Sequence, residues 1–203
     1  MLLLRLEPNG IREPHWHPNA AELDYVIEGR ARMTILSPGG RVDTFDVGNL
    51  INSWIPAVDN GRILEKLQKG AKVADVGCGF GTTTLMMAKT YRNSSFIGFD
   101  FHKESIQRAN ELAKRENLNN VKFEVSSASE FAGNDYDFVT FFDCLHDMGD
   151  PQGALTHTKD VIKKDDGVCM IVEPFAQNEL ENNLNPVGRT FYAASSLICV
   201  PTP

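Results

Sequence analysis

The fold is decided by the stretch Val73-Ala74-Asp75-Val76-Gly77-Cys78-Gly79-Phe80-Gly81, together with Asp100 at the end of Phe96-Ile97-Gly98-Phe99-Asp100. A short apolar run leads into three glycines at alternate positions. A helical segment follows, and a second apolar run ends in a carboxylate. Glycine lets the backbone turn tightly and approach a ligand where a Cβ would collide. This order of strand, glycine turn, helix, strand and acid is typical of a nucleoside-cofactor site.

Two classes of cofactor use such a turn with an acid on the ribose hydroxyls. The dinucleotide fingerprint needs a glycine at the third position after its second glycine, and that position is Thr82 here. The turn is instead Gly-x-Gly-x-Gly, and Asp75 precedes it by two residues. It resembles the first motif of class I S-adenosylmethionine-dependent methyltransferases. The resemblance implies S-adenosylmethionine, and not NAD, as the ligand.

The resemblance also implies a role for each residue near the turn. The glycines would pass under the methionine portion, whose carboxylate the helix N-terminus near Thr82 would favour. Asp75 would orient the methionine amino group, directly or through water. Asp100 would accept from both ribose hydroxyls, although it could also be only a surface acid that ends a strand. The implied cofactor-binding residues are Asp75, Gly77, Cys78, Gly79, Gly81, Asp100, Phe101, Ser127, Ala128 and Phe142.

Two further motifs extend the resemblance, from about residue 52 onward, to bacterial small-molecule methyltransferases. They are Phe141-Phe142-Asp143-Cys144-Leu145-His146-Asp147-Met148-Gly149-Asp150-Pro151 and Glu173-Pro174-Phe175. The implied catalytic residues are Asp143, beside sulfonium and acceptor, and His146, which could take a proton from the acceptor. Alternatives stay open: Asp143 could cap the helix that starts near Pro151, and His146 could serve packing or capping. Glu173 could touch the substrate or have no catalytic role.

Strands and helices alternate after residue 50. Strands are expected at 73–76, 96–99, 121–125, 136–142 and 168–173, and helices at 51–68 with a break around Pro56, 83–90, 104–116 and 151–164. This alternation predicts an α/β fold, with a parallel sheet and helices on both faces, as in the Rossmann-like sheet of class I methyltransferases. Residues 177–185 are expected to form a surface loop, or a lid over the substrate.

The first 48 residues have a different character. Alternating stretches at 23–27, 31–36 and 41–45, separated by turn signals, predict antiparallel hairpins. The run 12–20 resembles the first motif of the cupins, most closely that of the oxalate decarboxylases. The resemblance implies that His15, His17 and Glu22 hold a divalent metal, manganese or iron. The second cupin motif, with its further histidine, is absent, so these strands could also keep the sequence without binding metal.

Composition narrows the function classes. With 203 residues and a formal net charge of −7, the chain does not offer the basic surface that nucleic-acid binding needs. The apolar start at residues 1–6 is too short for a signal segment or a membrane span, so a cytoplasmic protein is expected. The four cysteines show no metal-site spacing and are expected to be reduced and buried: Cys78, Cys144, Cys169 and Cys199.

The sequence therefore predicts two domains, a partial cupin-like β segment at 1–48 and a methyltransferase domain at 49–203. The second lacks the C-terminal hairpin that would complete its sheet, so it is expected to be truncated, with the strand at 168–173 as an open edge that invites self-association. The predicted function is methyl transfer to a small-molecule acceptor. The alternatives are a metal-binding cupin module and a non-catalytic S-adenosylmethionine-binding protein.

Overall fold

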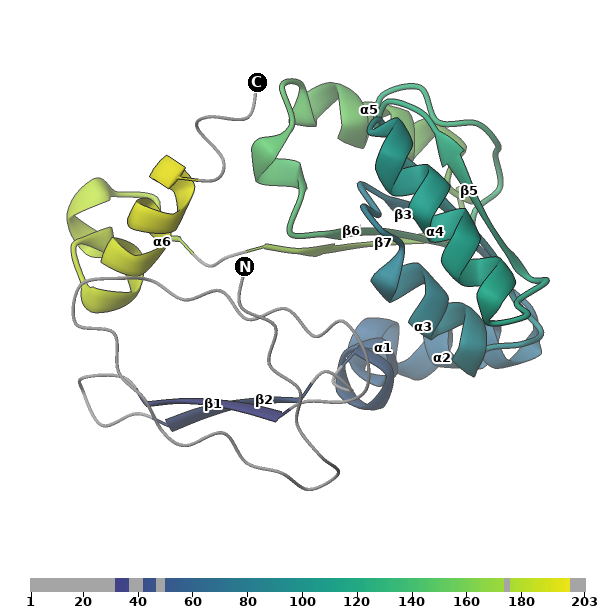
Figure 1. The fold of residues 1–203 in the computed structure, drawn as a ribbon, viewed down its shortest axis with the longest axis horizontal. Coiled ribbons are helices and arrows are strands. Elements are labelled where there is room, and N and C mark those ends of the chain that lie inside the picture. The colour runs from purple at the N-terminus through teal and green to yellow at the C-terminus, as the bar shows by residue number, and fades with distance from the viewer. Residues whose placement is uncertain (1–31, 37–41, 47–49, 174–175, 198–203) are drawn as a thin grey trace. The chain divides into compact units, whose positions relative to one another are not determined.

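The computed structural model describes residues 32–36, 42–46, 50–173 and 176–197 (Figure 1). The described residues up to 176 and those from 177 onward belong to different compact units, and each unit is described by itself. The first of these units contains the sheet and all of the described residues that the sequence assigns to the cofactor site.

Five parallel strands form that sheet, in the order β5-β4-β3-β6-β7. Its strands are β3 (Lys72–Val76), β4 (Ser95–Asp100), β5 (Val121–Val125), β6 (Phe138–Phe142) and β7 (Val168–Val172). The chain runs outward from β3 to β5, then crosses back to β6 on the other side of β3. The topology therefore switches between β3 and β6, which is where ligands bind in open sheets of this kind. The predicted Rossmann-like parallel sheet is confirmed.

Both faces of the sheet are covered by helices. One face packs against α2 (Arg62–Lys69), α3 (Thr82–Thr90) and α4 (Lys103–Arg115), and the other against α5 (Pro151–Val161). Successive strand residues serve opposite faces, because Phe138 lies in the first cluster and Val139 in the second. Both side chains are fully buried. The near-continuous apolar character of β6 follows from this two-sided burial.

The helical segment before β3 breaks later than predicted. Helical turns η1 (Leu50–Trp54) and α1 (Ile55–Ala57) lead into η2 (Val58–Gly61), and Pro56 lies within α1. The kink falls instead at Asp59 and Asn60, whose φ angles are 50° and 53°. A proline in the first helical turn loses no intrahelical hydrogen bond, so Pro56 does not end the helix.

A two-stranded antiparallel sheet precedes this segment. Its strands β1 (Arg32–Leu36) and β2 (Val42–Asp46) pair from Arg32 opposite Asp46 to Leu36 opposite Val42. The hairpin predicted from 31–36 and 41–45 is confirmed, while the strand predicted at 23–27 lies outside the described residues.

The second unit contains the turn η4 (Leu180–Asn183) and the helix α6 (Pro186–Leu197). Asn183 is buried and its side chain bonds to the backbone of Gln177 and Glu179, whereas the other residues at 177–185 are exposed. Asn185 caps α6 by accepting from the amide of Gly188 at 2.9 Å. The predicted surface segment is therefore an ordered turn followed by a capped helix.

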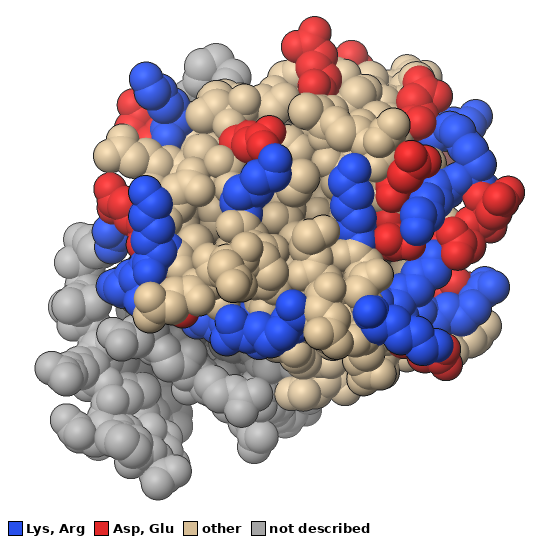
Figure 2. All heavy atoms as spheres, turned by 90° about the vertical axis from the view of Figure 1, so that its right-hand side faces the viewer, with Lys and Arg blue, Asp and Glu red and all other residues tan. Residues whose placement is uncertain are grey.

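Acidic and basic side chains are interspersed on the face of the molecule shown in Figure 2. Ion pairs in the described part of the chain include Lys66 with Asp166 at 2.7 Å and Lys122 with Glu124 at 2.6 Å. Among the helices in the described part of the chain, none is long and apolar enough to cross a membrane.

Candidate functional site

All the predicted site residues in the described part of the chain lie at one edge of the parallel sheet. Because the strands run in the same direction, their carboxyl ends meet there. The glycine turn follows β3, Asp100 ends β4, Ser127 follows β5, and Asp143 follows β6. Glu173, which follows β7, joins them at the same edge.

The backbone conformation and the packing of the turn explain why its residues are glycines. Gly77, Gly79 and Gly81 have φ angles of 72°, 52° and 76°, a region that other residues rarely adopt. A Cβ on Gly77 would lie 2.6 Å from Cys144 Sγ, and one on Gly81 would lie 2.5 Å from the Phe123 ring. A Cβ on Gly79 would meet no protein atom within 4 Å. Two of the glycines are thus required by packing, whereas the third leaves an open approach to the backbone.

Asp100 secures this turn from β4. Its Oδ2 accepts from the amide of Gly79 at 2.9 Å, and its Oδ1 accepts from the amide of His102 at 2.9 Å. Each carboxylate oxygen can accept a second hydrogen bond, so Asp100 can hold the turn and still receive hydroxyl donors.

Asp75 lies beneath the turn and is 1% exposed. Its Oδ2 accepts from the hydroxyls of Thr83 and Thr84 at 2.8 and 2.6 Å, and its Oδ1 accepts from Thr140 at 2.8 Å. Burial raises the pKa of Asp75, and the three hydroxyls oppose that rise. The contacts connect β3 with α3 and β6, so Asp75 orients the start of α3.

The remaining cofactor candidates differ in exposure. Phe101 is 73% exposed, Ser127 is exposed beside Glu130, and Ala128 and Phe142 are half-buried. Cys78 is buried at the turn, where its amide donates to Phe99 O at 3.0 Å. An exposed aromatic ring next to Asp100 offers an apolar surface to a planar base.

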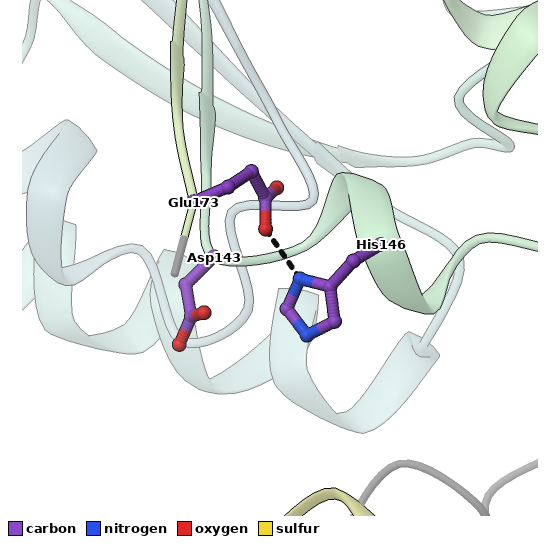
Figure 3. Close-up of side chains that lie close together, drawn as sticks. All are labelled: Asp143, His146 and Glu173. Carbon is purple, nitrogen blue, oxygen red and sulfur yellow. Dashed lines mark hydrogen bonds and ion pairs between the residues drawn. The ribbon is translucent and has the colours of Figure 1, made fainter. Parts of the chain in front are cut away.

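A second cluster consists of Asp143, His146 and Glu173, shown in Figure 3. Glu173 Oε2 is hydrogen-bonded to His146 Nδ1, while Glu173 Oε1 accepts from the amides of Cys144 and Leu145 at 3.2 and 2.7 Å. The other ring nitrogen, His146 Nε2, lies 3.3 Å from Asp147 Oδ1. One potential ligand atom from each of the three clustered residues lies within 4.8 Å of the others, so the group has the geometry of a cation site as well as of a proton-transfer site.

The cluster shifts two pKa values. Partial burial acts to lower the pKa of His146, but the hydrogen bond to Glu173 and the charges of Asp147 and Asp143 outweigh it and raise that pKa. Burial, with the nearby negative charges of Glu173 and Asp147, raises the pKa of Asp143 against the opposing effect of His146. The surrounding carboxylates therefore favour the protonated imidazole, and His146 is the candidate proton-transfer group of the cluster.

One alternative left open for Asp143 is excluded, and one prediction about the cysteines is wrong. Asp143 does not cap α5, because Asp150 Oδ1 accepts from the amide of Gly153 at 2.8 Å and fills that role. The cysteines are not all buried, since Cys144 is half-buried and Cys169 is exposed, although Cys78, Cys144 and Cys169 are free thiols. Burial raises the pKa of Cys144 to about 12, which keeps it protonated. His15, His17, Glu22 and Cys199 lie outside the described residues.

Sequence reasoning missed some residues at this edge. The hydroxyl partners of Asp75 were not expected, although Thr83 and Thr84 follow the glycine turn directly and a first helical turn rich in hydroxyls was a usable signal. Glu173 was left open as a substrate contact or a bystander. Nothing in the local pattern indicated that it contacts His146, 27 residues earlier.

Comparison with known proteins identifies relatives of the parallel-sheet part of the chain. An uncharacterized methyltransferase of Schizosaccharomyces pombe is 31% identical over 127 residues, which cover 58% of this chain and 46% of that protein. The crystal structure of YcgJ from Bacillus subtilis superposes with a TM-score of 0.52 at 25% identity, over 57% of this chain and 49% of that one. The chain thus spans about half the length of these relatives.

The N-terminal residues resemble a different protein. The oxalate decarboxylase OxdC of Bacillus subtilis is 48% identical over 44 residues, which cover 22% of this chain and 11% of that enzyme. A family profile described as "Cupin" matches residues 1–77, and one described as "Methyltransferase domain" matches residues 67–195. The predicted combination of a cupin-like segment with a methyltransferase is confirmed, and over most of its length the chain belongs to the methyltransferase domain family.

Proposed function

We propose that this chain is an S-adenosylmethionine-dependent methyltransferase that acts on a small-molecule acceptor. One observation carries the proposal. The space above the Gly79 backbone is open, and the amide of this same residue donates to Asp100 Oδ2. A bare backbone beside a carboxylate with spare acceptor capacity suits a ligand that brings both a ribose and an amino-acid portion.

The residues at the sheet edge fit such a ligand. The methionine portion of the ligand would lie against the turn residues Gly77, Cys78, Gly79 and Gly81. The N-terminus of α3 would attract the carboxylate of that portion. Asp100 would accept from the ribose hydroxyls, and Asp75 would act by orienting α3. The base would lie against Phe101, Ser127 and Ala128, with Phe142 toward the sulfonium. When bound, S-adenosylmethionine supplies an activated methyl group.

Asp143 and His146 are the proposed catalytic residues. They follow β6 at the switch between β3 and β6, beside the glycine turn. Asp143 would orient the acceptor, and His146 would take up its proton. Transfer needs the acceptor held in line and water excluded, so positioning is the main task of the protein.

Calorimetric titration with S-adenosylhomocysteine, the demethylated product, tests the proposal. We expect binding to the purified chain and a higher melting temperature, because a ligand selective for the folded state stabilises it by mass action. NAD is the matched control and is expected to leave the melting temperature unchanged. A shift with NAD and none with S-adenosylhomocysteine would contradict the proposed reading of the glycine turn.

A metal site in the N-terminal segment is a second candidate, favoured by the similarity to oxalate decarboxylase. We propose a boundary between residues 48 and 49, with His15, His17 and Glu22 as the candidate ligands. Three ligands without the second cupin motif form a poorly preorganised site, so we expect weak or no retention of manganese or iron. Elemental analysis of protein purified without added metal checks this, and a stoichiometric content would instead support a cupin-type metal module.

The proposal includes a cytoplasmic location and no partner other than the acceptor and further copies of the chain. The formal net charge of −7 disfavours nucleic acid as the acceptor.

A further inference from the structure

Glu173 has two kinds of contact at the acceptor end of the proposed site. Its Oε1 accepts from two successive backbone amides, those of Cys144 and Leu145, immediately before His146. Its Oε2 is bonded to the Nδ1 atom of the imidazole itself. One carboxylate thus fixes the backbone that carries His146. It also fixes the rotation of the His146 ring (Figure 3).

The contact with Nδ1 also determines where the imidazole holds its proton. An ionised carboxylate can only accept, so Nδ1 must donate and carry the hydrogen. In the neutral ring, Nε2 then carries the lone pair that can accept a proton. Asp147 Oδ1 lies 3.3 Å from Nε2, close enough for its charge to stabilise the ring when Nε2 is protonated as well.

We propose that Glu173 is a positioning residue, which holds the proton of His146 on Nδ1 so that Nε2 accepts a proton from the methyl acceptor. This inference rests on the proposed methyltransferase function. It names the acceptor class as neutral small molecules that carry a hydrogen on the reacting atom, such as a hydroxyl, thiol or amine.

The proton balance is simple. As the reacting atom forms its bond to the methyl carbon, the bond from that carbon to sulfur breaks and its electron pair remains on sulfur. The acceptor's own bond to hydrogen breaks, its electron pair stays on the reacting atom, and the proton moves to Nε2. The resulting imidazolium donates to Glu173 through Nδ1, is stabilised by the nearby carboxylate of Asp147, and later returns a proton to water.

Among the described residues, the negative groups that act on His146 are Glu173 after β7, Asp147 in η3 (Leu145–Asp147), and Asp143 after β6. Together these carboxylates raise the pKa of His146 against the opposing effect of partial burial. They therefore stabilise the imidazolium that proton uptake creates. Their positions differ in consequence. Glu173 acts on Nδ1 and thereby selects the tautomer, whereas Asp147 acts on Nε2 and only stabilises the charged ring.

Proton transfer accounts for the cluster better than a cation does. Glu173 Oε2 and His146 Nδ1 form a donor–acceptor pair that directs both atoms at each other. The other oxygen of Glu173 is engaged by two amides. A cation that used Nδ1 would have to displace its proton and break this pair.

Glu173→Gln is the decisive substitution, and Asp147→Asn is its matched control. The two amides donate to Glu173 Oε1, so they are expected to select the carbonyl oxygen of the glutamine, whose NH₂ group then faces Nδ1. An NH₂ donor requires Nδ1 to accept, so the neutral ring should invert to the tautomer protonated on Nε2. Asn at 147 removes a charge beside Nε2 and leaves the bond to Glu173 unchanged.

The readout is the ¹⁵N chemical shift of both His146 ring nitrogens across a pH titration, with His146→Gln used to identify the signals by their loss. In the unsubstituted protein we expect the neutral ring to carry its proton on Nδ1. Glu173→Gln should invert the tautomer and move the titration midpoint downward by about one pH unit. Asp147→Asn should also move the midpoint downward but keep the tautomer.

An unsubstituted protein whose neutral His146 is protonated on Nε2 would overturn the inference, and this result needs no variant to fold. A tautomer and midpoint unchanged by Glu173→Gln, or inverted equally by Asp147→Asn, would also overturn it. One equivalent of Zn²⁺ that removes the Nδ1 proton at neutral pH would assign the cluster to a cation instead. Calorimetry with S-adenosylhomocysteine is run separately, so absent binding would overturn the proposed function and leave Glu173 to the NMR result.

Discussion

At the scale of a single residue, a substitution at Gly79 is expected to affect ligand binding much more than folding. A Cβ at this position meets no protein atom within 4 Å, so the strain in Gly79→Ala comes from its φ of 52° alone. That conformation costs about 1 kcal/mol for alanine. We expect a folded variant with a slightly lower melting temperature that has lost S-adenosylhomocysteine binding, because the methyl group occupies the open approach. Calorimetry combined with a thermal melt measures both effects.

Gly81→Ala is the matched control for this prediction. Its Cβ would lie 2.5 Å from the buried ring of Phe123 and 3.1 Å from Ala109 Cβ, so the fold itself should be destabilised by at least about 2 kcal/mol. Unchanged affinity in a folded Gly79→Ala variant would place the ligand away from the glycine turn.

The sequence indicated the important residues of the glycine turn but not all of the residues that they contact. The glycine turn and Asp100 were recognisable because backbone conformation and a strand end determine them locally. Two distant partners were not, because Thr140 in β6 contacts Asp75 and Glu173 after β7 contacts His146 only once the tertiary fold brings these elements together. Local patterns predict where a polar side chain lies, and the order of strands determines what it contacts.

Asp137 provides the test at the scale of elements. Its Oδ2 accepts from the amide of Lys72 at the start of β3, and its Oδ1 accepts from Lys163 Nζ at 2.6 Å. We expect Asp137→Asn to lower the free energy of unfolding at pH 7 by about 2 kcal/mol, since the residue is 7% exposed and these bonds are charge-assisted. Asp166→Asn, which removes an exposed partner of Lys66, should cost less than about 1 kcal/mol.

The effect of Asp137 depends on pH in a definite direction. Burial acts to raise its pKa, but the hydrogen bonds from Lys163 and Lys72 and the lysine charges outweigh burial and lower that pKa. A carboxylate with a lowered pKa stabilises the fold above its unfolded value of about 4, and that stabilisation is lost as pH falls through the lowered value. Urea unfolding at pH 7 and again below pH 4 should therefore show the gap to Asp137→Asn narrowing in acid. A constant gap would exclude the ionised form as its source.

Whole elements were easier to predict than their ends. The five strands of the parallel sheet were all found, because apolar runs buried on both faces are distinctive. Helix ends depend on single side-chain contacts. The helix α5 starts at Pro151, directly after its capping residue Asp150, and it ends at Val161, three residues before the predicted end. The break expected at Pro56 falls at Asp59, since proline is tolerated in a first turn.

The open side of β7 provides the test at the scale of the whole molecule. In the described part of the chain, β7 pairs only with β6, and its Ile171 is 44% exposed. Apolar strand edges invite pairing, so we expect the N-terminal segment or a second copy of the chain to cover this one. Deleting residues 1–48 should lower solubility or the melting temperature, or the full chain should self-associate in light scattering. A monomer that tolerates the deletion would contradict both versions.

The position of β6 next to β3 has a consequence for synthesis on the ribosome. Thr140 reaches Asp75 across 65 residues of sequence, so β3, the glycine turn and α3 all emerge well before the strand that completes their hydrogen bonds. Parallel sheets with distant partners form slowly and leave strand edges exposed meanwhile. During synthesis β3 therefore lacks its partner β6, and its exposed edge can pair with a wrong strand. The proposed cofactor site is then completed late, although its glycine turn is translated before most of the sheet.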